Sequence, residues 1–294
     1  MGSGKPNGSP GRIATRSCAW AAEPAITRGP PTTNSWAFPP ETCELELDEK
    51  WSFVGKKQAH CDPADPADDH KGDWWDHVAY DPEHRLVLVV VPGARSLENA
   101  EEVVQEAYDR TAQRTDVFLT SDEYAAYETA IEHVYGVPEP PPPASTPGRR
   151  PVEPQRTVPP ELTYATVHKE RKGGRVVAIV TAVVLGTWQH LAEALSRSGV
   201  SQTINTAFVE RHHGTDRHRN ARKARRTYRF SKDWHMHEAM TYFTMYSYNF
   251  CWPVRTLRER APDGTWRPKT PAMSAGLTDH VWSLVEWLTF PAVQ

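Results

Sequence analysis

The sequence lacks the features that mark membrane, secreted and disulfide-stabilised proteins. No run approaches the ~20 consecutive apolar residues that span a bilayer, and residues 1–31 have no apolar middle region like that of a secretory signal. The four cysteines are far apart, with no C-x-x-C pair, which excludes a disulfide scaffold and an ordinary zinc ribbon. No G-x-S-x-G or Walker pattern occurs, which argues against serine hydrolases and nucleoside triphosphatases. We therefore expect a cytoplasmic protein without a membrane partner.

Apolar residues are also scarce. They make up 38% of the 294 residues, below the ~45–50% of typical globular chains, whereas prolines number 26. Residues 1–40 hold seven of these prolines and show no helical or strand periodicity, which predicts a disordered or decayed leader. Ten of the 24 residues at 137–160 are proline, so we expect residues 137–203 to form a proline-rich connector and an insertion.

The pattern of residues 41–136 is typical of the first part of an α/β core. It predicts three strands, a helix, a strand and a helix, at 44–53, 74–80, 86–91, 96–112, 116–120 and 123–135. The first three strands would form an antiparallel meander, which the fourth joins by a crossover. Leu45 and Leu47 would face the core, and the alternate residues, Asp48 among them, would form a polar face. The run LVLVVV at 86–91 is apolar on both faces and predicts a central strand.

The remaining segments are expected to be a hairpin and several helices. β-rich runs at 164–169 and 175–185 flank Gly173-Gly174, and Thr187 begins a helix that extends to Ser198. Further helices are predicted at 205–217 and 234–250 within a unit at 204–258, followed by a partly helical tail at 259–294.

Two carboxylates stand at strand ends of the predicted core. Asp48 lies on the first strand, and Asp122 lies just beyond the fourth. If these strands are neighbours, the two acids meet, and like charges at that range favour a hard divalent cation. The alternative is structural, because Asp122 could simply cap the helix that follows.

A third acid, Glu210, lies in a strongly basic segment. Residues 205–235 hold nine Lys/Arg and three Asp/Glu, or +6, whereas the whole chain has 34 against 37, or −3. Ile204, Phe208 and His212 recur every four positions and predict a packed helix face that leaves Glu210 free. Five arginines of the segment can pair with phosphates: Arg211, Arg217, Arg222, Arg225 and Arg229. The segment therefore indicates nucleic-acid binding, and a solvated basic face is the alternative.

These acids and their surroundings resemble the insertion-sequence transposases of the DDE type, most closely the insertion-sequence-one family. The matching stretches, in order, are LDEKWSFVGKK (47–57), VFLTSDEYAAYE (117–128), INTAFVERHHGTDR (204–217), RRTYRFSKDW (225–234), YNFCWPVRTLR (248–258) and TPAMSAGLTDHVW (270–282). The resemblance spans roughly residues 43–288.

The resemblance implies an RNase H-like mixed sheet flanked by helices, with a proline-linked hairpin and helix inserted before the last catalytic helix. It implies that Asp48, Asp122 and Glu210 are catalytic acids that hold two Mg²⁺ (or Mn²⁺) ions for in-line phosphoryl displacement. The expected partners are element-end and target DNA, bound by a homo-oligomer that associates with the nucleoid. The resemblance implies DNA contacts by five residues: Arg211, His212, Arg217, Arg222 and Arg226.

Two departures from the family pattern leave alternatives open. Asp122 and Glu210 are 88 positions apart, more than in compact family members. The N-terminal zinc-binding and helix-turn-helix region typical of the family has no counterpart in residues 1–40. The chain could therefore be a remnant that only binds DNA, or another RNase H-like nuclease.

Overall fold

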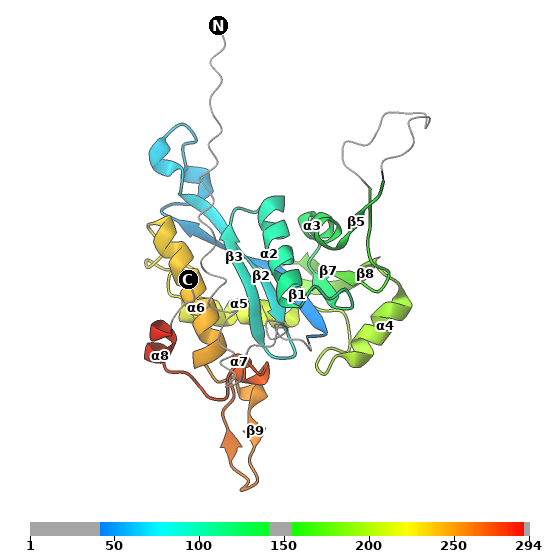
Figure 1. Ribbon diagram of the computed structural model, residues 1–294. Coiled ribbons are helices and arrows are strands. Elements are labelled where there is room, and N and C mark those ends of the chain that lie inside the picture. Colours follow the sequence, from blue (N-terminus) through cyan, green and yellow to red (C-terminus); the bar gives the residue numbers. More distant parts are fainter. Residues whose placement is uncertain (1–41, 141–154, 291–294) are drawn as a thin grey trace, which may run out of the picture.

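A six-stranded mixed sheet forms the centre of the protein (Figure 1). The computed structural model describes residues 42–140 and 155–290. The strand order is β3-β2-β1-β4-β7-β8. Neighbouring strands are antiparallel except for β1–β4 and β4–β7, which are parallel. The strands are β1 (Glu44–Val54), β2 (Gly72–Asp81), β3 (Leu86–Gly93), β4 (Phe118–Ser121), β7 (Thr163–Lys172) and β8 (Arg175–Leu185).

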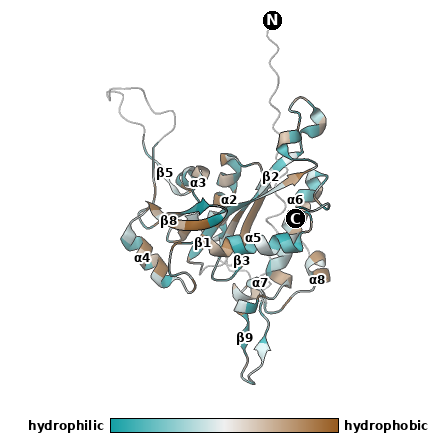
Figure 2. Cartoon of the chain, turned by 180° about the vertical axis from the view of Figure 1, so that it is seen from behind, coloured by the Kyte–Doolittle hydropathy of each residue, from teal (hydrophilic) through white to brown (hydrophobic). Residues whose placement is uncertain are grey.

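Helices cover both faces of this sheet. Figures 1 and 2 show α2 (Leu97–Arg110) and α3 (Ala125–Tyr135) on one face and α5 (Ala207–Arg219) on the other. The other elements are α4 (Trp188–Arg197), α6 (Trp234–Cys251), α7 (Pro271–Ser274), α8 (Leu284–Thr289), and the small strand pairs β5 (Val137–Pro138) with β6 (Arg156–Thr157) and β9 (Glu259–Arg260) with β10 (Trp266–Arg267). Within the described ranges, no helix is long and apolar enough to cross a membrane.

The order of the first six elements confirms the sequence prediction, and it is compatible with an RNase H-like fold. Local sequence signals mark where these elements begin. At the start of α2, the Ser96 side chain accepts a hydrogen bond from the backbone N–H of Asn99, which satisfies a donor that the first helical turn leaves unpaired. The apolar stripe of α2 is buried on the sheet except for Leu97, which is 38% exposed.

The position predicted for residues 86–91 is wrong, because β3 is an edge strand of the sheet. Its residues are nevertheless buried, since α6 lies against this edge. The Asn249 side chain of α6 donates to the carbonyl of Val87 (2.8 Å) and accepts from its N–H (3.0 Å). An amide side chain thus takes the place of a neighbouring strand.

The hairpin predicted as an insertion also belongs to the main sheet. β7 pairs in parallel with β4, and β8 forms the other edge of the sheet. The first half of β7 is buried, as a strand inside a sheet should be. The leader at 1–40 and the prolines at 141–154 lie outside the described residues, so the proposed domain boundaries remain predictions.

The polar face predicted for β1 is not exposed to solvent. Glu44, Glu46 and Lys50 are buried because the chain leading to α5, and α5 itself, cover them. Glu46 accepts a hydrogen bond from the backbone N–H of Val209 (2.7 Å), and Lys50 pairs with Asp216 of α5. These buried polar residues of β1 (Glu44, Glu46 and Lys50), here called the polar row of β1, therefore fix the position of α5 over the sheet.

Burial of these glutamates makes the stability of the fold depend on pH. Burial raises the pKa of Glu46 to about 8, despite the hydrogen bond from Val209. Glu44 and Glu49 shift in the same direction, each to about 7, chiefly through burial. The folded protein holds the protons of these three glutamates more tightly than the unfolded chain does. The stability that these glutamates contribute is therefore present below about pH 4.5 and is lost as pH rises towards 8.

Glu46→Gln is expected to raise stability at pH 9 by on the order of a few kcal/mol and to leave it nearly unchanged at pH 4. The amide oxygen can still accept from Val209, but no buried charge forms. Urea unfolding midpoints at the two pH values measure this effect. Glu193→Gln, on the exposed surface of α4, is the control. An equal response of the two variants at pH 9 would contradict the prediction.

Candidate active site

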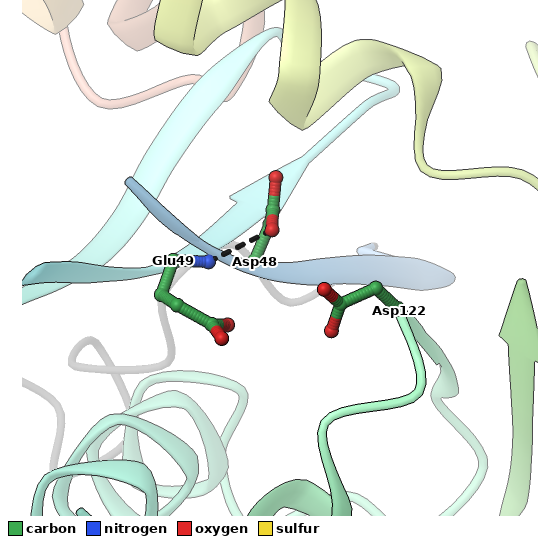
Figure 3. A group of neighbouring side chains, drawn as sticks. All are labelled: Asp48, Glu49 and Asp122. Atoms are coloured by element: carbon green, nitrogen blue, oxygen red, sulfur yellow. Dashed lines mark hydrogen bonds between the residues drawn. The ribbon is translucent and has the colours of Figure 1, made fainter. Parts of the chain in front are cut away.

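Three carboxylates meet where β1 and β4 lie side by side (Figure 3). Leu47 of β1 is in register with Ser121 of β4, so Asp48 and Asp122 each stand one position beyond a paired residue. Asp48, Glu49 and Asp122 each place one carboxylate oxygen within 4.8 Å of the others. The structure therefore brings Asp48 and Asp122 together, as the strand order predicts, and adds Glu49.

Glu49 is a site residue that the sequence analysis missed. Side chains alternate along a strand, so Glu49 points to the opposite side of the sheet from Asp48, on the face that holds Leu45 and Leu47. An acid in such a core-facing position was the available signal, because buried carboxylates are rare without a partner. Arg95, which follows β3, is one such partner, because its Nε lies 2.6 Å from Glu49 Oε1.

The electrostatics of the cluster fit a bound cation. Burial and then the charge of Asp48 raise the pKa of Asp122. Burial and then the charge of Asp122 raise the pKa of Glu49 to about 7, although Arg95 opposes the shift. The second oxygen of Glu49, Oε2, is buried and has no hydrogen-bond partner among residues 42–140 and 155–290. A hard divalent cation prefers oxygen donors of this kind, and it would relieve both the repulsion and the unpaired oxygen.

Asp48 is held in place by contacts of its own. Its Oδ1 accepts from the N–H of Glu49 (2.9 Å), and its Oδ2 lies 3.2 Å from Nδ1 of His213 on α5. His213 is buried, and its other ring nitrogen has no hydrogen-bond partner in the part of the chain that the structure describes. His213 therefore links the first acid directly to α5.

Glu210 lines the same cavity, of about 690 Å³, but it is not part of the three-acid cluster. Its carboxylate pairs with Lys169 of β7 and accepts a hydrogen bond from Thr206 Oγ1 (3.0 Å). The side chain is 44% exposed. The structure thus places the third predicted acid on the wall of the cavity, turned towards a cation of the protein.

Basic side chains form much of the remaining wall. Lys169 and Arg171 come from β7, Arg217 from α5, and Arg225 from the segment after α5. Of the other predicted DNA contacts, Arg211 and Arg226 are exposed, and Arg222 lines a second cavity. The cavity is therefore acidic where β1 and β4 meet and basic at the surrounding wall. Asp48 does not lie at a strand end, contrary to the prediction, because β1 continues to Val54.

The predicted DNA contact by His212 is wrong. His212 is buried, with its ring 5.0 Å from that of Tyr80 and 4.7 Å from that of Tyr248. Its Nε2 lies 3.2 Å from the sulfur of Met245. Burial lowers the pKa of His212 to about 3, so the ring is neutral and packs in the core. The predicted four-residue stripe was only partly right, because Ile204 lies before α5 and Phe208 is half-buried. The buried face of α5 consists of Val209, His212, His213 and Asp216, and a residue on that face cannot also bind phosphate.

No protein-family model and no curated protein matches the chain. Among solved structures, the chain is similar to the Mos1 transposase paired-end complex with left transposon end, at 16% identity and a TM-score of 0.21. The match covers 45% of this chain and 45% of that chain, so it spans less than half of either. The described residues form a mixed α/β protein with three carboxylates in a cavity at its sheet.

Proposed function

We propose that this chain is a DDE-type transposase, of the insertion-sequence-one kind, that cleaves and transfers DNA strands at element ends. Asp48, Asp122 and Glu210 are its catalytic acids in this proposal. The observation that carries it is the meeting of Asp48 and Asp122 just beyond the last paired residues of two adjacent parallel strands, inside a cavity with basic walls. The partners are element-end and target DNA, which the chain meets in the cytoplasm at the nucleoid.

The residues that would hold a metal are Asp48, Asp122 and Glu49, joined by Glu210. A donor set of carboxylate oxygens alone favours Mg²⁺ or Mn²⁺ over softer metals. When bound, such an ion would polarise a phosphoryl oxygen and lower the pKa of a water molecule. To join this site, the Glu210 side chain has to leave its ion pair with Lys169 and turn towards the three acids. An ion pair of this exposure is worth only ~1 kcal/mol or less, so the exchange is inexpensive.

The basic wall gives the cavity its proposed affinity for DNA. Arg217 and Arg225 line it, and neither forms an ion pair with a carboxylate in the described residues. Guanidinium groups bind phosphates in two-pronged geometry, so these two arginines are placed to hold the strand beside the acids. Arg211, Arg222 and Arg226 would contact the flanking phosphates.

A second candidate is a transposase remnant that binds DNA without cleaving it. The observation that favours it is the ion pair between Glu210 and Lys169, which leaves the third acid outside the cluster.

One experiment separates the two candidates. The full chain is incubated with labelled duplex from the DNA flanking its gene and with Mg²⁺ or Mn²⁺, as wild type, Glu210→Gln and Glu123→Gln. Glu123 lines the same cavity and pairs with His168, so it is the matched control. We expect all three to bind DNA and only Glu210→Gln to lose cleavage. Binding without cleavage by all three would favour the remnant, and cleavage by Glu210→Gln would remove Glu210 from the catalytic set.

We further propose that the chain works as a homo-oligomer that pairs through β8. Within the described part of the chain, β8 is an open edge of the sheet. After Arg175 it has no charged residue, and Val177 and Ile179 are 59% and 61% exposed. A long apolar edge without charges is a ready template for another strand. Antiparallel pairing with a second β8 would also place the two Arg175 side chains at opposite ends.

The double variant Val177→Lys/Ile179→Lys is therefore expected to convert an oligomer into a monomer, because it places charges on the pairing strand. Light scattering after size-exclusion chromatography measures the mass. Val285→Lys changes an exposed apolar residue on α8, outside the sheet, and should leave the mass unchanged. A monomeric wild type would refute the proposal.

A further inference from the structure

A second cavity, of about 500 Å³, lies between the C-terminal end of α5, the segment 220–232 and α6. Among the described residues, its wall contains no carboxylate. It contains four cations and two aromatic rings: Arg219, Arg222, Arg229, Lys232, Tyr228 and Phe230. This composition differs from that of the first cavity, where acids and cations face one another. The second cavity can hold an anionic ligand with a flat ring.

Aromatic rings, rather than acids, contact two of the four cations of this cavity. Arg219 lies over the ring of Trp252 (4.0 Å) and near that of Tyr248 (5.0 Å), and Lys232 lies over Phe230. In the described ranges none of the four cations forms an ion pair with a carboxylate. By contrast, Lys223 of the same segment is buried and pairs with Asp76. The positive charge at the cavity therefore remains available to a ligand.

Among the described residues, Tyr228 is the most exposed large hydrophobic side chain. It is 97% exposed, so it contributes almost nothing to the packing of the fold. Phe230, two positions later, does anchor the segment, because its ring lies 4.8 Å from that of Phe53. The anchored Phe230 holds Tyr228 at the cavity, where its ring is free to stack on a flat ligand.

The same segment connects the two cavities. Arg225 lines the first, whereas Arg222 and Tyr228 line the second. Arg225 and Tyr228 are three positions apart in the chain, so a DNA strand held beside the acids by Arg225 also meets the segment that carries Tyr228. A duplex cannot stack a base on Tyr228, because its bases are already stacked inside the helix. An unpaired nucleotide can, and the volume of the cavity is in the range of single small ligands.

We propose that this cavity binds one unpaired nucleotide of the DNA strand next to the cleavage site, with its base on Tyr228 and its phosphates on Arg222, Arg229 and Lys232. The proposal rests on the proposed function for its choice of DNA. It adds a specificity for single-stranded ends that the acidic cavity alone does not provide. Stacking of this kind tolerates any base, since every base has an aromatic face.

Binding of two probes tests this proposal: a blunt duplex, and the same duplex with a short single-stranded overhang, made with either polarity. The full chain is used with Ca²⁺, to separate binding from cleavage. Tyr228→Ala is expected to weaken binding of the overhang probe by about 5- to 100-fold and to leave the blunt probe unchanged. Tyr228→Phe keeps the ring and should bind like wild type. Trp266→Ala, an exposed aromatic on β10, is the control.

An equal loss on both probes, or no loss on either, would overturn the proposal. A fluorescent base analogue in the overhang should be quenched by wild type and by Tyr228→Phe, and quenching retained in Tyr228→Ala would also overturn it. Failure of the proposed function looks different. If the wild type does not cleave DNA, but Tyr228→Ala still weakens binding of the overhang probe, then the nucleotide site is supported and the nuclease activity is refuted.

Discussion

Asp122→Asn is expected to reduce metal-dependent DNA cleavage by about 10³-fold or more, the largest change in activity that we expect from a single conservative substitution. The amide has the shape of the carboxylate, but it carries no charge and is a poor ligand for a hard cation. The backbone N–H of Tyr124, which donates to Asp122 Oδ1 (3.2 Å), can still find an oxygen there. The fold should therefore survive while the cation site is lost.

Thermal unfolding separates this explanation from simple misfolding. Burial and the neighbouring Asp48 raise the pKa of Asp122, so its ionised form is unfavourable without a cation. Asp122→Asn should then melt at or above the temperature of the metal-free wild type, and Mn²⁺ should stabilise only the wild type. Asp109→Asn, on the exposed side of α2, should keep both responses. Retained cleavage and a retained Mn²⁺ shift in Asp122→Asn would show that the cluster is not the metal site.

The parts of this site that could be predicted depend on local patterns. Alternation placed Asp48 on a strand, and the chain direction placed Asp122 just past another. The sequence left open whether the two strands are neighbours, and the pairing of β1 with β4 in the structure answers that question. The same alternation could also have identified Glu49. A residue one position from Asp48 belongs to the other face of the strand, and there an acid needs a partner such as Arg95.

The parts that could not be predicted depend on contacts between distant residues. The prolines at 137–160 looked like the start of a separate insertion, yet the chain re-enters the sheet as β7 beside β4. A proline-rich composition shows where the chain leaves the core, but it does not show whether the following residues pair with the same sheet. The pairing of Glu210 with Lys169, 41 positions away, is of the same kind. His212 shows the converse, because charged neighbours along the chain led to a phosphate contact for a ring that the fold buries.

Lys50→Met is expected to cost about 3–5 kcal/mol of stability, because it leaves buried carboxylates without their cation. Lys50 of β1 is fully buried between Asp76 of β2 and Asp216 of α5. Although burial favours the neutral amine, these two acids hold the pKa of Lys50 above its ordinary value, so the amine is charged. Lys223 also pairs with Asp76, with its Nζ 2.6 Å from each oxygen. One cation would then have to serve two acids.

The loss should also reach the site, because Asp216 lies one turn from His213, the residue that contacts Asp48. Urea unfolding measures the stability, and Lys269→Met is the matched control, since its partner Glu259 is exposed and the pair is worth ~1 kcal/mol or less. Adding Asp216→Asn to Lys50→Met should restore part of the stability, because one unpaired charge disappears. If Lys50→Met costs no more than Lys269→Met, the polar row of β1 does not hold α5 over the sheet. If it costs the expected amount and the double variant recovers, the charge of Lys50 is what fixes the helix that carries Glu210 and His213.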